Sequence, residues 1–258
     1  MPAASSLTKK CFKIVFGRPS RHQSNHPAIL ISVEGNVGAG KSTLIELLKD
    51  RHKDWNFIAE PVDMWSSIKN ERGESLLEVY YRDRKRWSYS FQSCALLSRF
   101  QNIQNAMTAL SPRGGGGGGF RPVFVTERCV DTDYFVFAQM LRDQGMMDKI
   151  EFDLYDRLYR HLRTSMKAPL TAIIHVDTSP AECLARIKTR NRAGESNISL
   201  DYLTDIEKYQ LKWIRSLGDM DVISTGGEGS GPALSDIESF VNRQLVSEEQ
   251  RKTYNVCL

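Results

Sequence analysis

The sequence predicts an α/β fold in which five parallel strands form one sheet flanked by helices. Two observations predict it. Short, continuous apolar segments alternate with segments of helical periodicity, which is typical of parallel strands buried between helices. A glycine-rich loop also follows the first apolar segment and leads directly into a helix. The composition agrees, because 41% apolar and 26% charged residues are ordinary for a globular protein.

The expected elements alternate along the chain. The first apolar segment is AILISV, and the later ones are equally short, so each predicts a buried strand. Strands are expected over residues 28–33, 57–59, 122–126, 171–176 and 221–224. Helices are expected over 41–51, 75–110, 131–144, 148–166, 180–189 and 200–217, with a last one from about 236. Aromatic residues crowd the long 75–110 region, where we expect a break near 87–91.

Charge is distributed unevenly between the start of the chain and the rest. Residues 1–33 contain five basic residues and no acidic one. Subtracting five from the 35 Lys+Arg leaves 30 basic against 31 acidic residues, so the remainder has a net charge of −1 although the chain carries +4. This neutral body argues against nucleic acid as a partner. No run of roughly 18 apolar residues occurs, so we expect no membrane partner.

We expect residues 1–27 to form a flexible basic leader and residues 28–258 to form the folded domain. The leader lacks acids and contains serines, which suits a disordered terminus or an organelle transit peptide, so a cytoplasmic and a mitochondrial location both stay open. Five widely spaced cysteines without C-x-x-C favour reduced thiols in an intracellular compartment. Six consecutive glycines, Gly114–Gly119, predict a surface insertion over 111–122, because such a run has no fixed backbone shape.

The segment Gly35–Ser42 fits the phosphate-loop pattern G-x-x-x-x-G-K-[ST]. Its place between a buried strand and a helix is the context that this motif requires. Glycines let backbone N–H groups converge on phosphate oxygens, and the helix N-terminus adds a positive dipole. Lys41 would reach the β- and γ-phosphates, and the Ser42 hydroxyl would hold Mg²⁺. The candidate nucleotide-binding residues are Gly35, Asn36, Val37, Gly38, Ala39, Gly40, Lys41, Ser42 and Thr43.

Charged residues gather at two strand ends and in one later helix. Glu60 follows the second strand and Glu127 and Arg128 follow the third, at the edge where open α/β sheets bind ligands. An adjacent carboxylate and guanidinium suit metal binding and a clamp on a transferring phosphate. Downstream, RIKTRNR predicts a lid over the phosphates rather than an ordinary solvated helix face. The candidate lid residues are Arg186, Arg190 and Arg192.

Five motifs in order make the sequence resemble the deoxynucleoside kinase family, most closely its deoxycytidine and deoxyguanosine kinase branch. They are EGNVGAGKST, EPVDMW, LLEVYYRDRKRWSYSFQS, VTERCVDTDYFVFA and RIKTRNRAGE, within about residues 28–215. The resemblance implies a P-loop kinase fold with an arginine-rich lid, ATP or another NTP as phosphate donor, Mg²⁺, and a homodimer formed through the long helices after the P-loop. It also implies phosphorylation of the 5′-hydroxyl of deoxynucleosides in nucleotide salvage.

The resemblance further implies roles for single residues. Glu60 would be the general base at the 5′-hydroxyl, oriented by Arg128, and Lys41 would serve the triphosphate. Ser42 and Glu127 would hold the metal, and Arg186, Arg190 and Arg192 would belong to the lid. Tyr81 and Glu195 would hold the sugar 3′-hydroxyl. The base pocket would comprise Trp65, Phe91, Gln92, Ala95, Arg99, Asp133 and Phe137.

The implied base pocket carries a prediction about the substrate. Gln92 offers an acceptor and a donor, so it can read a base edge bidentately. Arg99 and Asp133 match positions where the deoxycytidine and purine branch carries an ion pair, whereas the thymidine-using branch is apolar there. We therefore expect deoxycytidine or purine deoxynucleosides to be preferred over thymidine.

Three departures from the family pattern and two rival functions bear on this interpretation. Cys129 replaces the serine expected after Glu-Arg, and Tyr80 replaces a methionine, which narrows the sugar–base pocket. Gly226–Gly231 replaces an acidic stretch over the donor base, so ATP and UTP both stay open as donors. A nucleoside monophosphate kinase would need extra basic residues for its charged acceptor. A regulatory protein that binds nucleotide without turnover would not need Lys41, Glu60 and Arg128 together.

Overall fold

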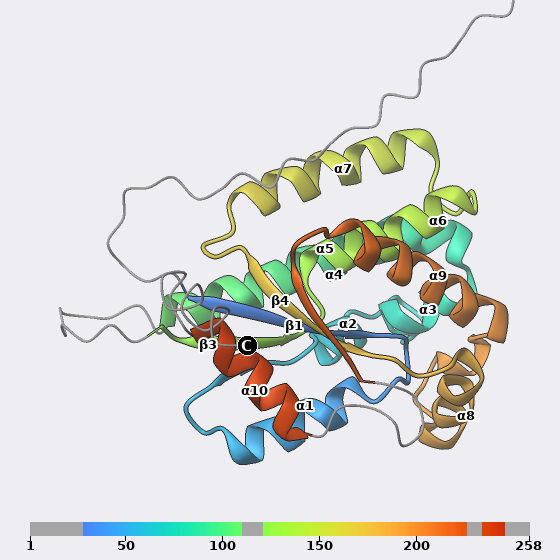
Figure 1. Ribbon diagram of the computed structural model, residues 1–258. Helices are drawn as coiled ribbons and strands as arrows, with labels where there is room; N and C mark the ends of the chain where they lie inside the picture. Colours follow the sequence, from blue (N-terminus) through green and yellow to red (C-terminus); the bar gives the residue numbers. More distant parts are fainter. Residues whose placement is uncertain (1–27, 110–120, 226–233, 246–258) are drawn as a thin grey trace, which may run out of the picture.

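The computed structural model describes residues 28–109, 121–225 and 234–245. Within them, five strands form one parallel sheet in the order β2-β3-β1-β4-β5 (Figure 1). They are β1 (Ile29–Gly35), β2 (Asn56–Ile58), β3 (Val123–Glu127), β4 (Leu170–Val176) and β5 (Asp221–Thr225). The predicted α/β class with a five-stranded parallel sheet is therefore confirmed. The leader, the glycine run and Gly226–Gly231 lie outside the described residues.

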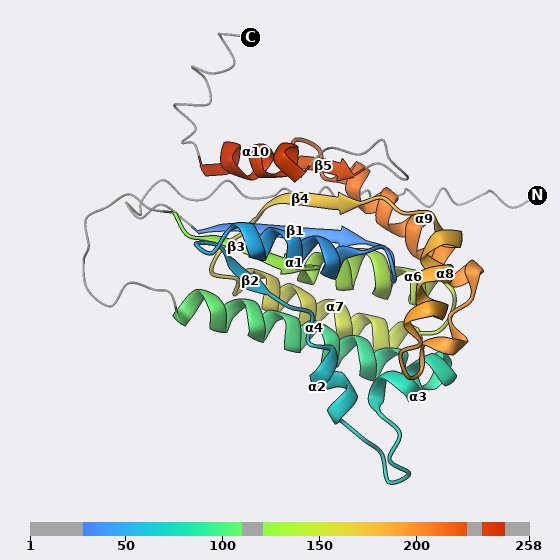
Figure 2. The same cartoon turned by 90° about the horizontal axis from the view of Figure 1, so that it is seen from below.

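Helices cover both faces of this sheet (Figures 1 and 2). α1 (Lys41–Arg51) and α10 (Leu234–Leu245) lie on one face, and α4 (Arg84–Ala109) lies on the other with α7 (Lys149–Thr164) packed against it. Every residue of β1 is buried, because this central strand has neighbours on both edges and helices on both faces. All five carboxyl ends point to one edge of the sheet, where the phosphate loop begins.

The long helical region divides at Asp83, so the expected break near residues 87–91 was wrong. α3 (Leu76–Arg82) ends there, and α4 continues unbroken from the next residue to Ala109. The Asp83 carboxylate accepts a hydrogen bond from the backbone N–H of Arg86 at 3.1 Å, as an N-cap side chain does. A helix start signal thus decides the boundary, and the aromatic residues of 87–91 lie inside the helix.

The remaining elements lie around the carboxyl edge of the sheet. A short α2 (Val62–Ser67), which the sequence did not predict, follows Glu60. The segment expected as one helix over 131–144 comprises α5 (Val130–Thr132), a π-helical turn (Asp133–Ala138) and α6 (Gln139–Asp143). α8 (Pro180–Arg190), a 3₁₀ turn (Glu195–Asn197) and α9 (Leu200–Ser216) complete this edge. Among the described residues, no helix combines the length and apolarity needed to cross a bilayer.

Candidate active site

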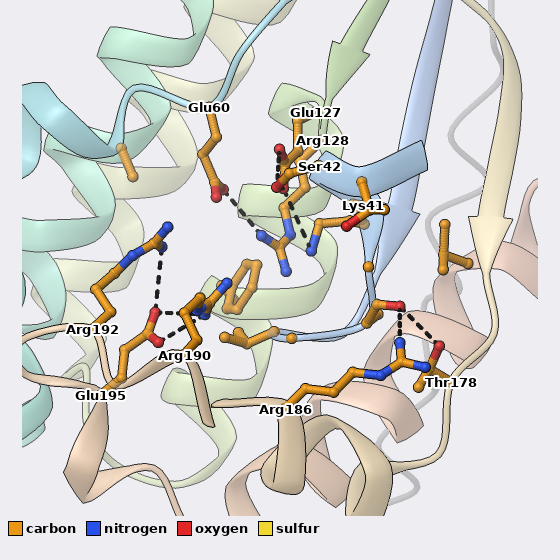
Figure 3. A pocket seen from close by; sticks show the side chains of 18 of the residues that line it. Lys41, Ser42, Glu60, Glu127, Arg128, Thr178, Arg186, Arg190, Arg192 and Glu195 are labelled. Atoms are coloured by element: carbon orange, nitrogen blue, oxygen red, sulfur yellow. Dashed lines mark hydrogen bonds and ion pairs between the residues drawn. The ribbon is translucent and has the colours of Figure 1, made fainter. Parts of the chain in front are cut away.

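A cavity of about 800 Å³ lies at the carboxyl ends of the strands, within the size range of small-molecule sites. The phosphate loop, α2, α3, α4, the π-helical turn and α8 all contribute to its walls. Every predicted site residue lines it except Gly35 and Asn36. The cavity thus brings together side chains from distant parts of the sequence, as Figure 3 shows for ten of them.

The phosphate loop is shaped to hold an anion with its backbone. Gly40, the residue before α1, has a left-handed φ of 102° and makes no side-chain cap, so the first N–H groups of the helix stay available. A Cβ at Gly38 would lie 2.8 Å from the Cys183 carbonyl oxygen, which only glycine avoids. The buried Asn36 side chain instead donates to the Leu203 carbonyl at 2.8 Å and ties the loop to α9.

Lys41 and Ser42 converge on one carboxylate at the end of β3 (Figure 3). The Ser42 hydroxyl donates to Glu127 Oε2 at 2.9 Å, and Lys41 Nζ lies 3.7 Å from Glu127 Oε1. Lys41 Nζ also donates to the Asn36 carbonyl at 2.8 Å. Burial, together with the nearby charge of Arg128, lowers the pKa of Lys41 to about 8. This lysine therefore loses its charge much closer to neutrality than an exposed one.

The lowered pKa predicts an alkaline limb in the activity. A lysine with a lowered pKa keeps its proton below that pKa and loses it as the pH rises, which removes a positive charge from the triphosphate site. With the phosphate acceptor saturating, kcat/KM for the nucleotide donor, which reports the enzyme before the donor binds, should fall as the pH rises through about 8. A profile that stays flat to about pH 10, the ordinary range for lysine, would contradict this assignment.

Two buried arginines hold Glu60 at the centre of the cavity. Arg99 Nη2 and Arg128 Nη1 each donate to Glu60 Oε1 at 3.0 Å. Oε2 has no protein partner among the described residues, so it is the oxygen left for an acceptor group. Arg99 also donates to Asp133 Oδ2 at 2.8 Å and to the Glu127 carbonyl at 2.7 Å, which links the base end of the cavity to the phosphate end.

The charge of Glu60 is set by these neighbours. Burial by itself would raise the pKa of Glu60, but the charges of Arg128, Arg99 and Lys41 outweigh it and lower the pKa to about 2. The carboxylate is therefore ionised at neutral pH. It is a weak base in the resting site, but it is well placed to orient a hydroxyl group that approaches Oε2.

Arg128 reaches its position through an unusual backbone. It has a φ of 61°, in the left-handed region that residues with a Cβ seldom adopt. This conformation lets Nη2 donate to the Gly35 carbonyl at 3.0 Å while Nη1 contacts Glu60. The guanidinium carbon also lies 5.2 Å from the centre of the Phe137 ring. One side chain thus joins the phosphate loop, the carboxylate and an aromatic wall.

The far end of the cavity is aromatic with one polar group. Trp65 meets Phe91 edge to face at 5.4 Å, and its Nε1 donates to Ser98 Oγ at 3.0 Å, which fixes the indole. Gln92 is buried, and its Oε1 has no protein partner among the described residues. A buried, unpaired amide oxygen is costly unless a ligand pairs with it. This end therefore suits a flat ring with a hydrogen-bond donor at its edge.

Tyr80 fills space beside this aromatic end. Its ring stacks on Phe91 at 4.3 Å, and its hydroxyl lies 3.0 Å from the hydroxyl of Tyr202.

Sequence reasoning missed Tyr202 as a lining residue, because it lies on an amphipathic helix without a motif. It also missed Thr178, which lines the phosphate end and follows β4. The strand-end rule that found Glu60 could have found Thr178.

The predicted lid arginines all line the cavity, and Figure 3 shows their contacts with Glu195 and with the phosphate loop. Arg190 Nη2 donates to both oxygens of Glu195, at 2.9 and 2.7 Å, and Arg192 Nη1 lies 3.4 Å from Glu195 Oε1. Arg186 Nη1 donates to the Ala39 carbonyl of the phosphate loop at 2.9 Å. Burial raises the pKa of Tyr81 well above its ordinary value, and the charge of nearby Glu195 adds to this. Glu195 thus holds two lid arginines and lines the same cavity as Tyr81, the tyrosine predicted to bind the sugar.

This parallel sheet, phosphate loop, strand-end carboxylate and arginine lid define a P-loop kinase, an enzyme that transfers a phosphoryl group from a nucleotide. Comparison with known proteins agrees. A family model described as deoxynucleoside kinase matches residues 31–251. The chain belongs to the deoxynucleoside kinase family and is a phosphotransferase acting on a nucleoside and a nucleoside triphosphate.

Several relatives are identical to this chain at about a third of the aligned positions. A probable deoxycytidine kinase of Fowlpox virus (strain NVSL) is 32% identical over 228 residues, 84% of this chain and 89% of that protein. The deoxycytidine kinase of Mus musculus is 31% identical over 198 residues, covering 71% and 74%. A mitochondrial deoxyguanosine kinase of Xenopus laevis is 30% identical over 197 residues, covering 71% and 72%. The resemblance seen in the motifs is therefore confirmed over most of the chain.

Proposed function

We propose that this enzyme transfers the γ-phosphoryl group of ATP to the 5′-hydroxyl of deoxycytidine or a purine deoxynucleoside in preference to thymidine. The observation that carries the preference is the polar floor of the base end. Arg99 and Asp133 are buried as an ion pair at 2.8 Å, and the unpaired Gln92 oxygen lies on the same wall. An exocyclic amino group can donate to that oxygen, and the charged floor disfavours a 5-methyl group. Relatives named deoxycytidine and deoxyguanosine kinases support this reading.

Glu60 is the proposed general base. Its free Oε2 would accept a hydrogen bond from the 5′-hydroxyl, while Arg99 and Arg128 hold Oε1. A carboxylate with a pKa near 2 is a poor base in the resting site. In a loose transition state the attacking oxygen becomes acidic only as the phosphoryl group arrives, so the carboxylate chiefly aims the hydroxyl and takes its proton late. Arg128 is placed to stabilise the charge that develops on the transferring group.

The phosphate loop and the lid are the proposed donor site. The backbone N–H groups at the start of α1 and the Lys41 ammonium would bind the triphosphate, and Arg186, Arg190 and Arg192 would close over it. The Ser42 hydroxyl and the Glu127 carboxylate fit Mg²⁺, which usually takes one or two protein oxygens together with phosphates and water. Bound there, Mg²⁺ would offset negative charge on the phosphate oxygens. No cluster of three His, Cys, Asp or Glu occurs among the described residues, and such a site needs none.

Tyr81 and Glu195 are the proposed contacts to the sugar 3′-hydroxyl. The phenol is a donor with a raised pKa, and the carboxylate is an acceptor, so the pair can bind one hydroxyl from two sides. A pair without a positive charge suits a nucleoside better than a nucleoside monophosphate, because neither of these two side chains would neutralise an acceptor phosphate.

A comparison of the four deoxynucleosides tests the proposed preference. With ATP saturating, kcat/KM for deoxycytidine, deoxyadenosine or deoxyguanosine should exceed that for thymidine by about tenfold or more, because the thymine methyl group meets a charged floor. Formation of each monophosphate by the purified chain is the measurement. A thymidine value equal to or above the others would contradict the preference and leave the family assignment intact.

We also propose that the enzyme is a homodimer through α4 and α7. Three large apolar side chains on these helices are exposed, Leu97 to 41%, Ile150 to 72% and Leu154 to 50%. Ile150 and Leu154 lie one helical turn apart, so they face the same way. We further propose an intracellular location, cytoplasmic or mitochondrial, for the kinase domain of residues 28–258. Widely spaced cysteines without C-x-x-C favour reduced thiols, and the acid-free basic leader of residues 1–27 leaves the mitochondrion open. The Xenopus relative is named a mitochondrial enzyme.

A further inference from the structure

A buried carboxylate that the proposed chemistry does not use lies directly behind the active site. Glu34, the residue before the phosphate loop, is fully buried and does not line the cavity. Its Oε1 accepts hydrogen bonds from Ser32 Oγ and Thr132 Oγ1, both at 2.5 Å, and from the backbone N–H of Cys129 at 3.2 Å. Its Oε2 has no partner among the described residues. Burying a carboxyl group is expensive, so one retained in a core requires an explanation.

The hydrogen bond from Cys129 places Glu34 next to Arg128, the site residue with the left-handed backbone. The backbone around Arg128 is held at three points. Its N–H donates to the Val33 carbonyl at 3.1 Å, and its carbonyl accepts from Thr126 Oγ1 at 2.9 Å. The third point is the N–H of the next residue, Cys129, which donates to Glu34. Backbone in the left-handed region persists only where its surroundings impose it, and these contacts are what impose it here.

We propose that Glu34 is a positioning residue for the reaction. By accepting from the Cys129 N–H and from Thr132, it fixes the peptide that follows Arg128 and so keeps the guanidinium on Glu60 and on the Gly35 carbonyl. This inference rests on the roles proposed above for Arg128 and Glu60. It also explains why cysteine can replace the serine of the family pattern at position 129. The hydrogen bond to Glu34 comes from the backbone N–H of this residue and does not depend on its side chain. The Cys129 sulfur lies 3.4 Å from Thr132 Oγ1 and makes no hydrogen bond with Glu34.

The property that matters is the acceptor oxygen rather than the negative charge. All three donors converge on Oε1, and the other oxygen has no partner within the described part of the chain. Burial raises the pKa of Glu34, while the hydrogen bonds from Ser32 and Thr132 oppose this rise. An amide at this position offers the same acceptor without the charge. A leucine has a similar volume and offers no acceptor, so Glu34→Gln and Glu34→Leu separate the two properties.

The test is a mutant cycle with Arg128. Glu34→Leu should lower kcat for deoxycytidine by about 10- to 100-fold, as expected when a catalytic group moves by about 1 Å. KM for deoxycytidine and for ATP should change by less than about threefold, because neither substrate site contacts Glu34. Glu34→Gln should keep kcat within about threefold of the wild-type value. In the Arg128→Ala background, adding Glu34→Leu should change kcat by less than about twofold, because the side chain that it positions is already gone.

Three results would overturn the proposal. The first is a kcat of Glu34→Leu equal to that of the wild type. The second is a double variant in which the reductions of kcat by Glu34→Leu and Arg128→Ala multiply. The third is an unchanged kcat with a raised KM for ATP, which would indicate damage to the phosphate loop. If Glu34→Leu does not fold, as judged by thermal unfolding, Thr132→Val replaces it in the cycle. This variant removes one donor to Glu34 and should lower kcat about three- to tenfold in the wild type and by less than about twofold in Arg128→Ala. The single variant Arg128→Ala separately tests the role on which the inference rests.

Discussion

Replacing Glu60 by glutamine should lower kcat by about 100-fold or more, the usual contribution of a positioned acid or base. The amide is nearly isosteric and can still accept from Arg99 and Arg128, so the variant should fold. It cannot take the proton of the attacking hydroxyl, and its neutral oxygen binds that hydroxyl more weakly. Steady-state formation of deoxycytidine monophosphate measures the effect.

A matched control lies three residues further along the chain. Asp63 is exposed on α2 and does not line the cavity, so Asp63→Asn makes the same carboxylate-to-amide change in the same segment. Its kcat should stay within about twofold of the wild-type value, as expected for a surface substitution. If Glu60→Gln retained activity within a few-fold, or if Asp63→Asn lost as much, the assignment of Glu60 as the base would be wrong.

Removing Asp133 alone should lower the free energy of unfolding more than removing both Asp133 and its partner Arg99. Asp133→Ala leaves the Arg99 guanidinium buried without one of its two carboxylate partners. Breaking a buried pair in this way destabilises by roughly 3–5 kcal/mol, and we expect about 3 kcal/mol because Arg99 keeps Glu60. The double variant Arg99→Met/Asp133→Ala removes both charges and should be more stable than Asp133→Ala. Denaturant unfolding of the wild type and both variants measures this order, and a double variant less stable than Asp133→Ala would contradict it.

The same double variant should change which base is accepted. An apolar floor accommodates a 5-methyl group, so the ratio of kcat/KM for thymidine to that for deoxycytidine should rise about 10- to 100-fold. Absolute kcat should fall, because Arg99 also holds Glu60. An unchanged ratio would show that the ion pair does not select the base.

Much of this site could be predicted because its residues follow local rules. The phosphate loop is a contiguous motif, and Glu60, Glu127 and Arg128 lie at strand ends, which parallel topology brings to one edge. Arg186 and Arg190 lie one helical turn apart in α8, and Arg192 follows just after the end of this helix. Each of these signals lies within a few neighbouring residues, so a single sequence can carry it. The base pocket instead came from resemblance, since an aromatic residue in a helix is more often part of the core.

Other features could not be predicted because they depend on contacts between distant segments. The left-handed backbone of Arg128 is imposed by Val33, Thr126 and Glu34, and no local pattern indicates it. Asn36 sits inside the phosphate-loop motif, yet its side chain contacts α9. The break at Asp83 does have a local signal, because aspartate is a strong N-cap residue, whereas the aromatic residues of 87–91 are compatible with the helix that follows.

The most direct test of this account follows the labelled γ-phosphoryl group of ATP in the presence of deoxycytidine and Mg²⁺. We expect the label to appear on the 5′-oxygen of deoxycytidine monophosphate, in an amount that depends on the nucleoside and is lost in Glu60→Gln. Label transferred only to an added deoxynucleoside monophosphate would show that the acceptor carries a phosphate. Label released only as inorganic phosphate, or not transferred at all, would equally contradict the proposed reaction.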